Sequence, residues 1–247
     1  MTTPTTAVLR SEWIKIKSVR SVLFSLIAVF AATLAVTVLA FATVGQAEAD
    51  DAGHDLLLSA FYALNFGQIA AISFGATALS SEFLNGALRI SLSAVPRRGL
   101  LYAAKMSVVG GLALAMGMVT SFATFLVGQM FMGEYAIGLG DPGALRASFG
   151  GGIYLALIAL FAAGLTAVLR SAVAVLSTLI PFLLIVSFVV GDIAGGIARY
   201  LPDQAGQLVL HQHPDGSLGP WAGLAVTAVW AGTALLAGWW RLRTRDA

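Results

Sequence analysis

The sequence contains no cysteine and very little charge. Of its 247 residues, 11% are Asp, Glu, Lys or Arg, whereas soluble domains contain roughly 25%. The lack of cysteine excludes a disulfide framework, a thiolate nucleophile and a cysteine-based metal site. The net charge of +2 is small and the basic residues form no single stripe, so the composition does not favour a nucleic-acid partner.

Histidine is also scarce, and all three histidines fall between the apolar stretches. His211 and His213 have the spacing of a weak metal site but lack a third ligand, so a solvated loop is favoured and no metal site is predicted. Asp192, at the outer end of the fifth apolar stretch, is the sole acid near such a stretch. A position at the end of a helix, at the membrane interface, accounts for it better than a transport role does. A proton- or sodium-coupled carrier would need intramembrane charges that are missing here.

The dipeptide Gly-Lys, which ends a phosphate-binding loop, does not occur in the sequence. A P-loop needs it because backbone amides and the lysine together hold the phosphates. Any role driven by ATP therefore requires that a separate chain bind the ATP and magnesium. The 27 glycines instead indicate close helix packing, at positions such as Gly110, Gly111, Gly117, Gly128 and Gly133.

What the sequence has is hydrophobicity. Hydrophobic residues make up 58% of the chain and the mean hydropathy is +0.88, which predicts an all-α integral membrane protein. About 20 apolar residues cross the hydrocarbon core as a helix. Six such stretches predict one transmembrane domain over 22–240, with spans at 22–44, 57–79, 106–132, 149–169, 172–193 and 221–240. A tight turn at Arg170 divides the fourth span from the fifth, and Pro181 should kink the fifth.

Residues 1–21 predict a short tail followed by an amphipathic helix in the plane of the membrane. Leu9, Trp13 and Ile16 recur at helical spacing while basic residues lie elsewhere, which is typical of an interfacial helix. Trp13 is the expected interfacial anchor. The stretch 22–44 is too long for the core of a cleaved signal peptide, so we expect an uncleaved span.

The basic residues predict the orientation. With the N-terminus in the cytoplasm, twelve of the fourteen lie inside, and only Arg146 and Arg199 lie outside. Both termini, including the tail 241–247, are then cytoplasmic. The inner set is Arg10, Lys15, Lys17, Arg20, Arg89, Arg97, Arg98, Lys105, Arg170, Arg241, Arg243 and Arg245.

The stretch 80–105 between the second and third spans carries four of these basic residues and one acid, Glu82. Phe83, Ala87 and Ile90 recur at helical spacing, which predicts a short amphipathic helix that docks against something. Pro96 should end that helix because proline restricts the residue before it and donates no hydrogen bond.

These features together resemble the permease subunits of the ABC-2 type transporter family. The family's cytoplasmic segment reads E-F-x-x-G-T-x-R followed by P-R-R or P-x-R. Here Glu82, Phe83, Gly86 and Arg89 match it, as do Leu92, Pro96 and Arg97, whereas Ala87 replaces the usual Thr and Asn85 a common basic residue.

The resemblance implies a bacterial plasma-membrane exporter built from two permease subunits, identical or different, and two ATPase subunits. Glu82, Phe83, Gly86 and Arg89 would form the coupling helix that meets the ATPase. The amphipathic N-terminal helix would lie along the inner membrane face beside it. The resemblance also implies short re-entrant helices over 194–220, although an ordinary outer loop fits that stretch equally well.

Asn65 and Gln68 lie one helical turn apart and could face a translocation path, or could hydrogen-bond between helices, which is the commoner use. The apolar spans favour a hydrophobic or amphipathic cargo. The alternative function is a membrane scaffold or immunity protein that binds a partner without moving cargo.

Overall fold

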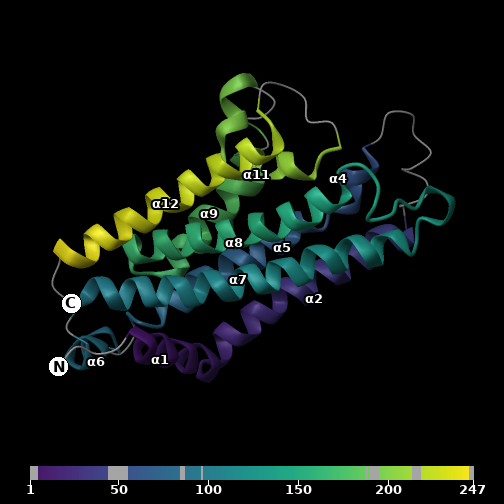
Figure 1. Ribbon diagram of the computed structural model, residues 1–247. Helices are drawn as coiled ribbons and strands as arrows, with labels where there is room; N and C mark the ends of the chain where they lie inside the picture. The colour runs from purple at the N-terminus through teal and green to yellow at the C-terminus, as the bar shows by residue number, and fades with distance from the viewer. Residues whose placement is uncertain are drawn as a thin grey trace.

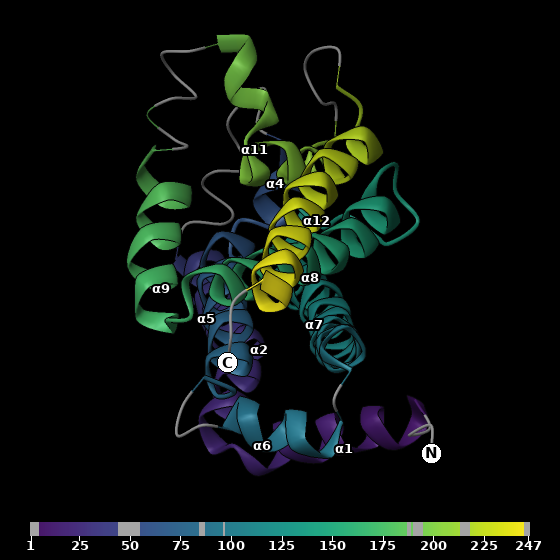
Figure 2. The same cartoon turned by 90° about the vertical axis from the view of Figure 1, so that its left-hand side faces the viewer.

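Every regular element in the described part of the chain is a helix. The computed structural model describes residues 5–43, 55–83, 87–95, 97–186, 189, 195–212 and 218–244. The longer helices run side by side as a bundle, while α1 and α6 lie across one end of it (Figures 1 and 2). In chain order the helices are α1 (Thr5–Ser18), α2 (Arg20–Thr43), α4 (Leu56–Ala60), α5 (Leu64–Ser80), α6 (Ala87–Ala94), α7 (Arg98–Gln129), η1 (Gly133–Tyr135), α8 (Ala144–Leu169), α9 (Ala172–Pro181), η2 (Phe182–Val186), η3 (Gly195–Tyr200), α11 (Pro202–Gln207), η4 (Leu208–Leu210) and α12 (Pro220–Thr244).

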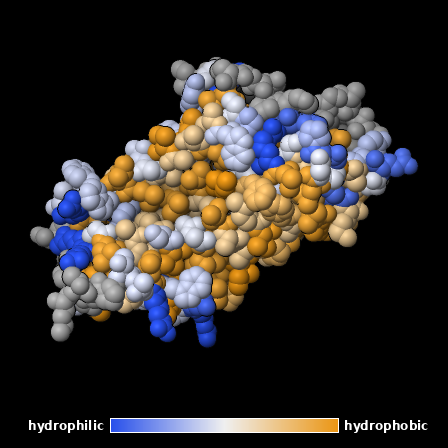
Figure 3. Space-filling model, viewed as in Figure 1, coloured by the Kyte–Doolittle hydropathy of each residue, from blue (hydrophilic) through white to orange (hydrophobic). Residues whose placement is uncertain are grey.

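The predicted membrane class is confirmed, and four of the helices are long and apolar enough to span a bilayer. They are α2, α7, α8 and α12. The predicted span at 57–79 corresponds to α4 and α5, which a turn at 61–63 separates. The predicted span at 172–193 corresponds to α9 and η2, and Asp192 lies outside the described residues. Six spans therefore remain a prediction. An apolar band covers the visible face between more hydrophilic ends (Figure 3).

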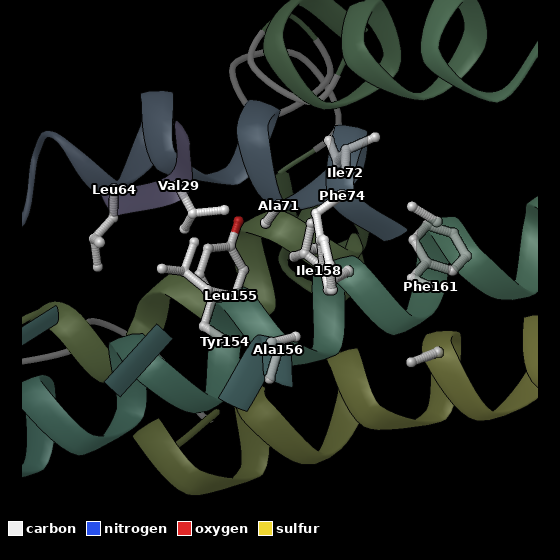
Figure 4. Close-up of a cluster of buried hydrophobic side chains, with 14 of the residues drawn as sticks. Val29, Leu64, Ala71, Ile72, Phe74, Tyr154, Leu155, Ala156, Ile158 and Phe161 are labelled. Carbon is white, nitrogen blue, oxygen red and sulfur yellow. The ribbon is translucent and has the colours of Figure 1, made fainter. Parts of the chain in front are cut away.

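Helix α8 is the centre of the bundle. It packs against α5, α7 and α12, and α2 covers α5 and α7 from outside. Of the most apolar stretch of α8, 67% is buried, against 28% for α2. Figure 4 shows Tyr154, Leu155 and Ile158 of α8 among side chains of α5. The helix with the highest mean hydropathy is thus not the most buried one, because α2 turns much of its surface outward.

Small residues let the backbones around α8 approach closely. A Cβ on Gly75 of α5 would lie 2.0 Å from the Ala159 carbonyl oxygen, and one on Gly117 of α7 would lie 2.6 Å from the Gly152 carbonyl oxygen. The close-packing prediction is confirmed for Gly117, and for Gly110 and Gly128, which face Leu160 and Phe41.

The same prediction is wrong for two other glycines. Nothing lies within 4 Å of a Cβ on Gly111, so this position faces open space. Gly133 lies beyond the end of α7, where a φ of 56° favours glycine in a turn. Periodicity alone does not reveal which face of a helix meets a neighbour.

The turn at Arg170 is confirmed. Arg170 ends α8 in the left-handed conformation with φ 56°, and its backbone N–H donates to the Thr166 carbonyl. Ser171 then caps α9, since its Oγ accepts from the Ala174 N–H at 3.2 Å. At Pro181 the α-helix gives way to the π-helical η2. Proline removes one backbone donor, which accounts for the change of geometry predicted there.

The stretch 195–212 folds back onto the bundle as short helices. Val209 and Leu210 are buried, and Val209 packs where Gly150 of α8 leaves room. Thr227 Oγ1 of α12 donates to the Pro202 carbonyl at 2.8 Å. This packing favours the short-helix alternative for 194–220 over an ordinary loop.

We expect Gly75→Ala to destabilise the protein and Gly111→Ala to leave it unchanged or slightly more stable. The new methyl group at position 75 would collide with the α8 backbone, which typically costs about 1–3 kcal/mol. At position 111 only the gain in helix propensity remains, up to about 1 kcal/mol. Thermal unfolding of the detergent-solubilised variants measures the difference. Equal melting temperatures would contradict the packing described for α5 and α8.

Candidate functional site

The predicted coupling segment forms a helix at one end of the bundle. After a turn at 81–83, α6 runs over Ala87–Ala94 and ends before Pro96, as predicted. Glu82 and Phe83 precede this helix, and Arg89 is part of it, although its side chain lies outside the described residues, as does Gly86. Helix α6 lies beside α1, across the bundle axis (Figure 2). We call this the basic end, because Lys15, Lys17, Arg98, Lys105 and Arg170 also lie on its elements.

Helix α6 docks through Leu92 and the following Val95. These side chains pack against a small cluster of Val8 from α1 and Leu101 and Ala104 from α7. A docking partner for the predicted row remains a prediction, and within this chain its Ile90 is 70% exposed. The reason is that α6 meets α1 and α7 on only one side, which leaves an apolar side chain uncovered.

Helix α1 packs against the bundle through a face that shares only Ile16 with the predicted apolar row. Val8, Glu12 and Ile16 are the buried residues of this helix. Trp13 is 40% exposed, and the Lys17 ammonium lies 4.7 Å from its ring centroid. Of the predicted row, Ile16 is therefore buried in the protein, whereas Leu9 and Trp13 are exposed. The exposure of Trp13 leaves it free to meet a membrane interface, and this role remains a prediction.

Four charged side chains meet between these helices. Lys105 Nζ of α7 lies 2.8 Å from Glu82 Oε1 and 3.2 Å from Glu12 Oε2. Lys15 Nζ of α1 lies 2.7 Å from Glu12 Oε1 and 3.5 Å from Glu82 Oε1, and it donates to Ser91 Oγ of α6 at 2.9 Å. We call Glu12, Lys15, Glu82 and Lys105 the charge cluster. Each lysine bridges both glutamates.

Most of the charge cluster is buried. The side chains of Glu12, Lys105 and Glu82 are 2%, 5% and 10% exposed, whereas that of Lys15 is 35% exposed. Burial alone would raise the pKa of the Glu82 carboxyl. The ammonium groups of Lys105 and Lys15 lower this pKa by more than burial raises it, so it lies below the usual value. Glu82 is therefore ionised at neutral pH.

Phe83 contacts a different part of the basic end. The Arg170 guanidinium lies 5.8 Å from the centroid of the Phe83 ring, in cation–π range. The turn between α8 and α9 is thereby next to the segment that leads into α6. Two of the predicted coupling residues, Glu82 and Phe83, thus contact α1, α7 and the end of α8.

Asn65 and Gln68 lie near the opposite end, in a pocket of about 440 Å³. Gln207 Nε2 of α11 donates to Asn65 Oδ1 at 2.9 Å and to the Tyr154 hydroxyl at 3.3 Å, and that hydroxyl donates to Gln68 Oε1. Asn65 and Gln68 thus make the predicted hydrogen bonds between helices and also line one pocket, while a translocation path there remains a prediction. We call it the amide pocket. Its other lining residues include Tyr62, Phe66, Leu183, Leu184, Asp203 and His211.

His211 is held by structural contacts. Its Nδ1 lies 3.5 Å from Asp55 Oδ2, and Arg146 donates to its backbone carbonyl. His54 and His213 lie outside the described residues. In the part of the chain that is described, no three His, Cys, Asp or Glu side chains are grouped as metal ligands.

Comparison with protein families decides the class of this molecule. Residues 8–191 match the model of a family described as ABC-2 family transporter protein. The chain belongs to this family. The match includes α1 from Val8 onward, all of α6 and the whole charge cluster. Comparison with curated proteins and with solved structures finds no significant match.

Family membership makes the chain an ABC-2 type permease, the transmembrane component of an ABC transporter and not its catalytic subunit. It also implies association with an ABC ATPase subunit in general. The resemblance seen in the sequence is thereby confirmed. The roles of the individual coupling residues in this permease remain predictions.

Sequence patterns did not reveal the charge cluster. Lys15 and Lys105 served only as topology signals, and Glu12 had no predicted role. One signal was available: acidic residues are few on the predicted inner side, and two of them, Glu12 and Glu82, flank the first and second spans. When a few acidic residues lie on the side of a membrane protein that is rich in Lys and Arg, they are candidates for ion pairs with nearby lysines.

We expect Lys105→Met to destabilise the permease strongly, while Lys17→Met does not. Removing one partner of a buried ion pair leaves uncompensated charge and costs roughly 3 kcal/mol or more. The Lys17 ammonium, by contrast, lies over the exposed Trp13 ring. Thermal unfolding in detergent measures both variants, and similar melting temperatures for both would contradict the burial of Lys105.

The stabilisation from Glu82 should depend on pH only in acid. Its pKa is lowered in the folded state, so its contribution is complete above the unfolded pKa of about 4.3 and is lost as pH falls through the folded value. The difference in melting temperature between the wild type and Glu82→Gln should stay constant from pH 8 to pH 6. A difference that shrinks steadily over this range would show that the carboxyl titrates there.

Proposed function

We propose that this permease is the membrane subunit of an ATP-driven exporter whose cytoplasmic side is the basic end. The observation that carries the proposal is the position of α6. It lies across the end of the bundle, packs against α1 and α7 on one side, and presents Ile90 on the other. An exposed apolar side chain on a docked helix suits a contact with a further protein.

The charges support the same orientation. Cytoplasmic loops of membrane proteins carry an excess of Lys and Arg. The ends of α1, α7, α8 and α12 that gather at the basic end bear Lys15, Lys17, Arg98, Arg170 and Arg241. A separate ATPase bound to α6 would supply the ATP, the magnesium and the driving force, and a second permease copy, identical or different, would complete the transporter in a bacterial plasma membrane.

The amide pocket supports a hydrophobic or amphipathic cargo. Its wall combines the amide groups of Asn65, Gln68 and Gln207 with apolar side chains such as Phe66 and Leu183. Amides bind hydroxyl or carbonyl groups, and apolar walls bind hydrocarbon, so a molecule with both parts fits this lining. Asn65 and Gln68 would contact the cargo near its exit.

We expect Ile90→Glu to weaken binding of the ATPase at least tenfold without loss of insertion. A charge at the centre of an apolar contact is costly to desolvate, and ten-fold corresponds to about 1.4 kcal/mol. Pull-down of the ATPase subunit from solubilised native membranes measures this. Val173→Glu, an equally exposed apolar position at the start of α9, is the matched control.

Capture by wild type and by Val173→Glu, but not by Ile90→Glu, is the expected result. Equal capture by all three would place the ATPase contact away from α6. Absence of the ATPase in every sample, including chemically crosslinked membranes, would favour the alternative of a scaffold or immunity protein.

A photoreactive amino acid at position 65 should capture exported amphipathic compounds during ATP turnover in vesicles. The same probe at Val119, which is 57% exposed on the surface of α7, should capture lipid alone. Mass spectrometry of the adducts compares the two positions. If position 65 yields only crosslinks to Gln207 and its neighbours, Asn65 serves helix packing and not cargo.

A further inference from the structure

The charge cluster joins four separate segments at one point. Glu12 and Lys15 come from α1, Glu82 from the turn after α5, and Lys105 from α7, while Ser91 brings in α6 through Lys15. The four ion pairs alternate in sign around a closed circuit, from Lys15 to Glu12 to Lys105 to Glu82 and back to Lys15. No pair can open without straining two neighbours.

We propose that the charge cluster is the mechanical joint between α6 and the rest of the permease, with Lys15 as the residue that passes displacement of α6 to α1. Lys105 holds the fixed side of this joint. Glu12, Lys15 and Lys105 are thus positioning residues that act through α6. This inference rests on the proposed docking of an ATPase at α6.

Stability alone does not account for the cluster. Burying charges costs several kcal/mol for each ion, and apolar residues of similar size are often as stable or more so. Buried ion networks are best attested where they fix a register or operate a switch. Here the network lies where the predicted ATPase contact meets the bundle.

The cluster has a fixed side and a movable side. Lys105 is almost fully buried and its two carboxylate distances are 2.8 and 3.2 Å. Lys15 is 35% exposed and lies 3.5 Å from Glu82. A pocket of about 270 Å³ borders Lys15, Glu82, Ser91 and Ile90, which gives the Lys15 side chain room to move.

The charge cluster also supplies the polar link between α6 and α1. Apolar contacts of α6 through Leu92 and Val95 are with Val8 and with α7. Lys15 adds a directional contact, since its ammonium reaches Ser91 while it holds both glutamates. If α6 moved along its axis, its apolar side chains could slide over their neighbours, but the Lys15–Ser91 hydrogen bond would be stretched.

The test measures movement directly, and the absence of cysteine makes it practicable. Spin labels on cysteines at Ser93 of α6 and Trp240 of α12 report movement of α6. Labels at Ser11 of α1 and Trp240 report movement of α1. Electron–electron double resonance is recorded on the complete complex with its ATPase in lipid nanodiscs, before and after trapping with ATP and vanadate, with labelled permease diluted by unlabelled.

In the wild type we expect trapping to shift both distances. In Lys15→Met the α6 shift should persist while the α1 shift is lost. Lys15→Arg, which keeps the charge, should restore the α1 shift, and Lys17→Met, on the exposed face of the same helix, should resemble wild type. An α1 shift that survives in Lys15→Met would overturn the proposal, as would a wild-type complex in which α6 moves and α1 does not.

A second measurement separates this proposal from the proposed function. In the permease alone, labels at Ser11 and Ser93 should give a narrow distance distribution that Lys15→Met broadens about twofold and Lys17→Met leaves unchanged. An unchanged distribution in Lys15→Met would overturn the joint, whether or not an ATPase binds. A broadened distribution together with failed ATPase capture would retain the joint and reject the docking partner.

Discussion

The close approach of backbones around α8 is the constraint on which the rest of the fold depends. Lipid tails are as apolar as leucine, so helices in a bilayer gain little by hiding apolar surface and associate mainly through close packing. In this permease α5 and α7 meet α8 at glycines, where a side chain would collide with the opposite carbonyl. Helix α12 meets it in the same way, since a Cβ on Gly164 would lie 2.7 Å from the Ala234 backbone. The elements at both ends take their positions from this core.

At the basic end the helices are joined by ion pairs, whereas in the middle of the bundle they are joined by close packing at small residues. Among the described side chains, α1, α6 and α7 share a small apolar cluster. Lys105 adds an ion pair between α7 and α1, and Lys15 adds a hydrogen bond between α1 and α6. Near the opposite end, amide and hydroxyl groups hold α11 against α5 and α8. The two ends thus differ chemically, with ion pairs at one and neutral hydrogen bonds near the other.

Local signals in the sequence predicted local features well. Arg170 and Ser171 marked a turn because so few polar residues interrupt that stretch, and Pro96 marked the end of α6 because proline acts on its immediate neighbour. Hydropathy placed α2, α8 and α12 within a few residues. Hydropathy placed the start of α7 at 106, whereas the helix begins at Arg98. The charge of Lys105 lowers the local hydropathy and so indicates a loop, although this charge is paired with Glu12 and Glu82 inside the protein.

Features that depend on partners distant in sequence were not predictable in the same way. Glu12 and Lys105 are separated by the whole of the first two predicted spans, and no periodicity links them. The docking face of α1 could not be read from Leu9, Trp13 and Ile16, because Glu12 is buried once Lys105 neutralises it. The amide pocket likewise needs Gln207, from a stretch that the sequence left open between loop and short helices.

Helix α12 connects the two ends of the molecule without a break. Near the basic end, the Tyr102 hydroxyl and Arg98 of α7 donate to the Leu235 and Leu242 carbonyls at 3.0 and 3.1 Å. Near the other end, a Cβ on Gly223 would lie 2.1 Å from the Ala205 carbonyl oxygen of α11. An unbroken helix of 25 residues is about 37 Å long and resists bending. Helix α12 can therefore act as a lever: a tilt imposed beside α7 displaces α11, and with it one wall of the amide pocket, without any relay of side chains in between.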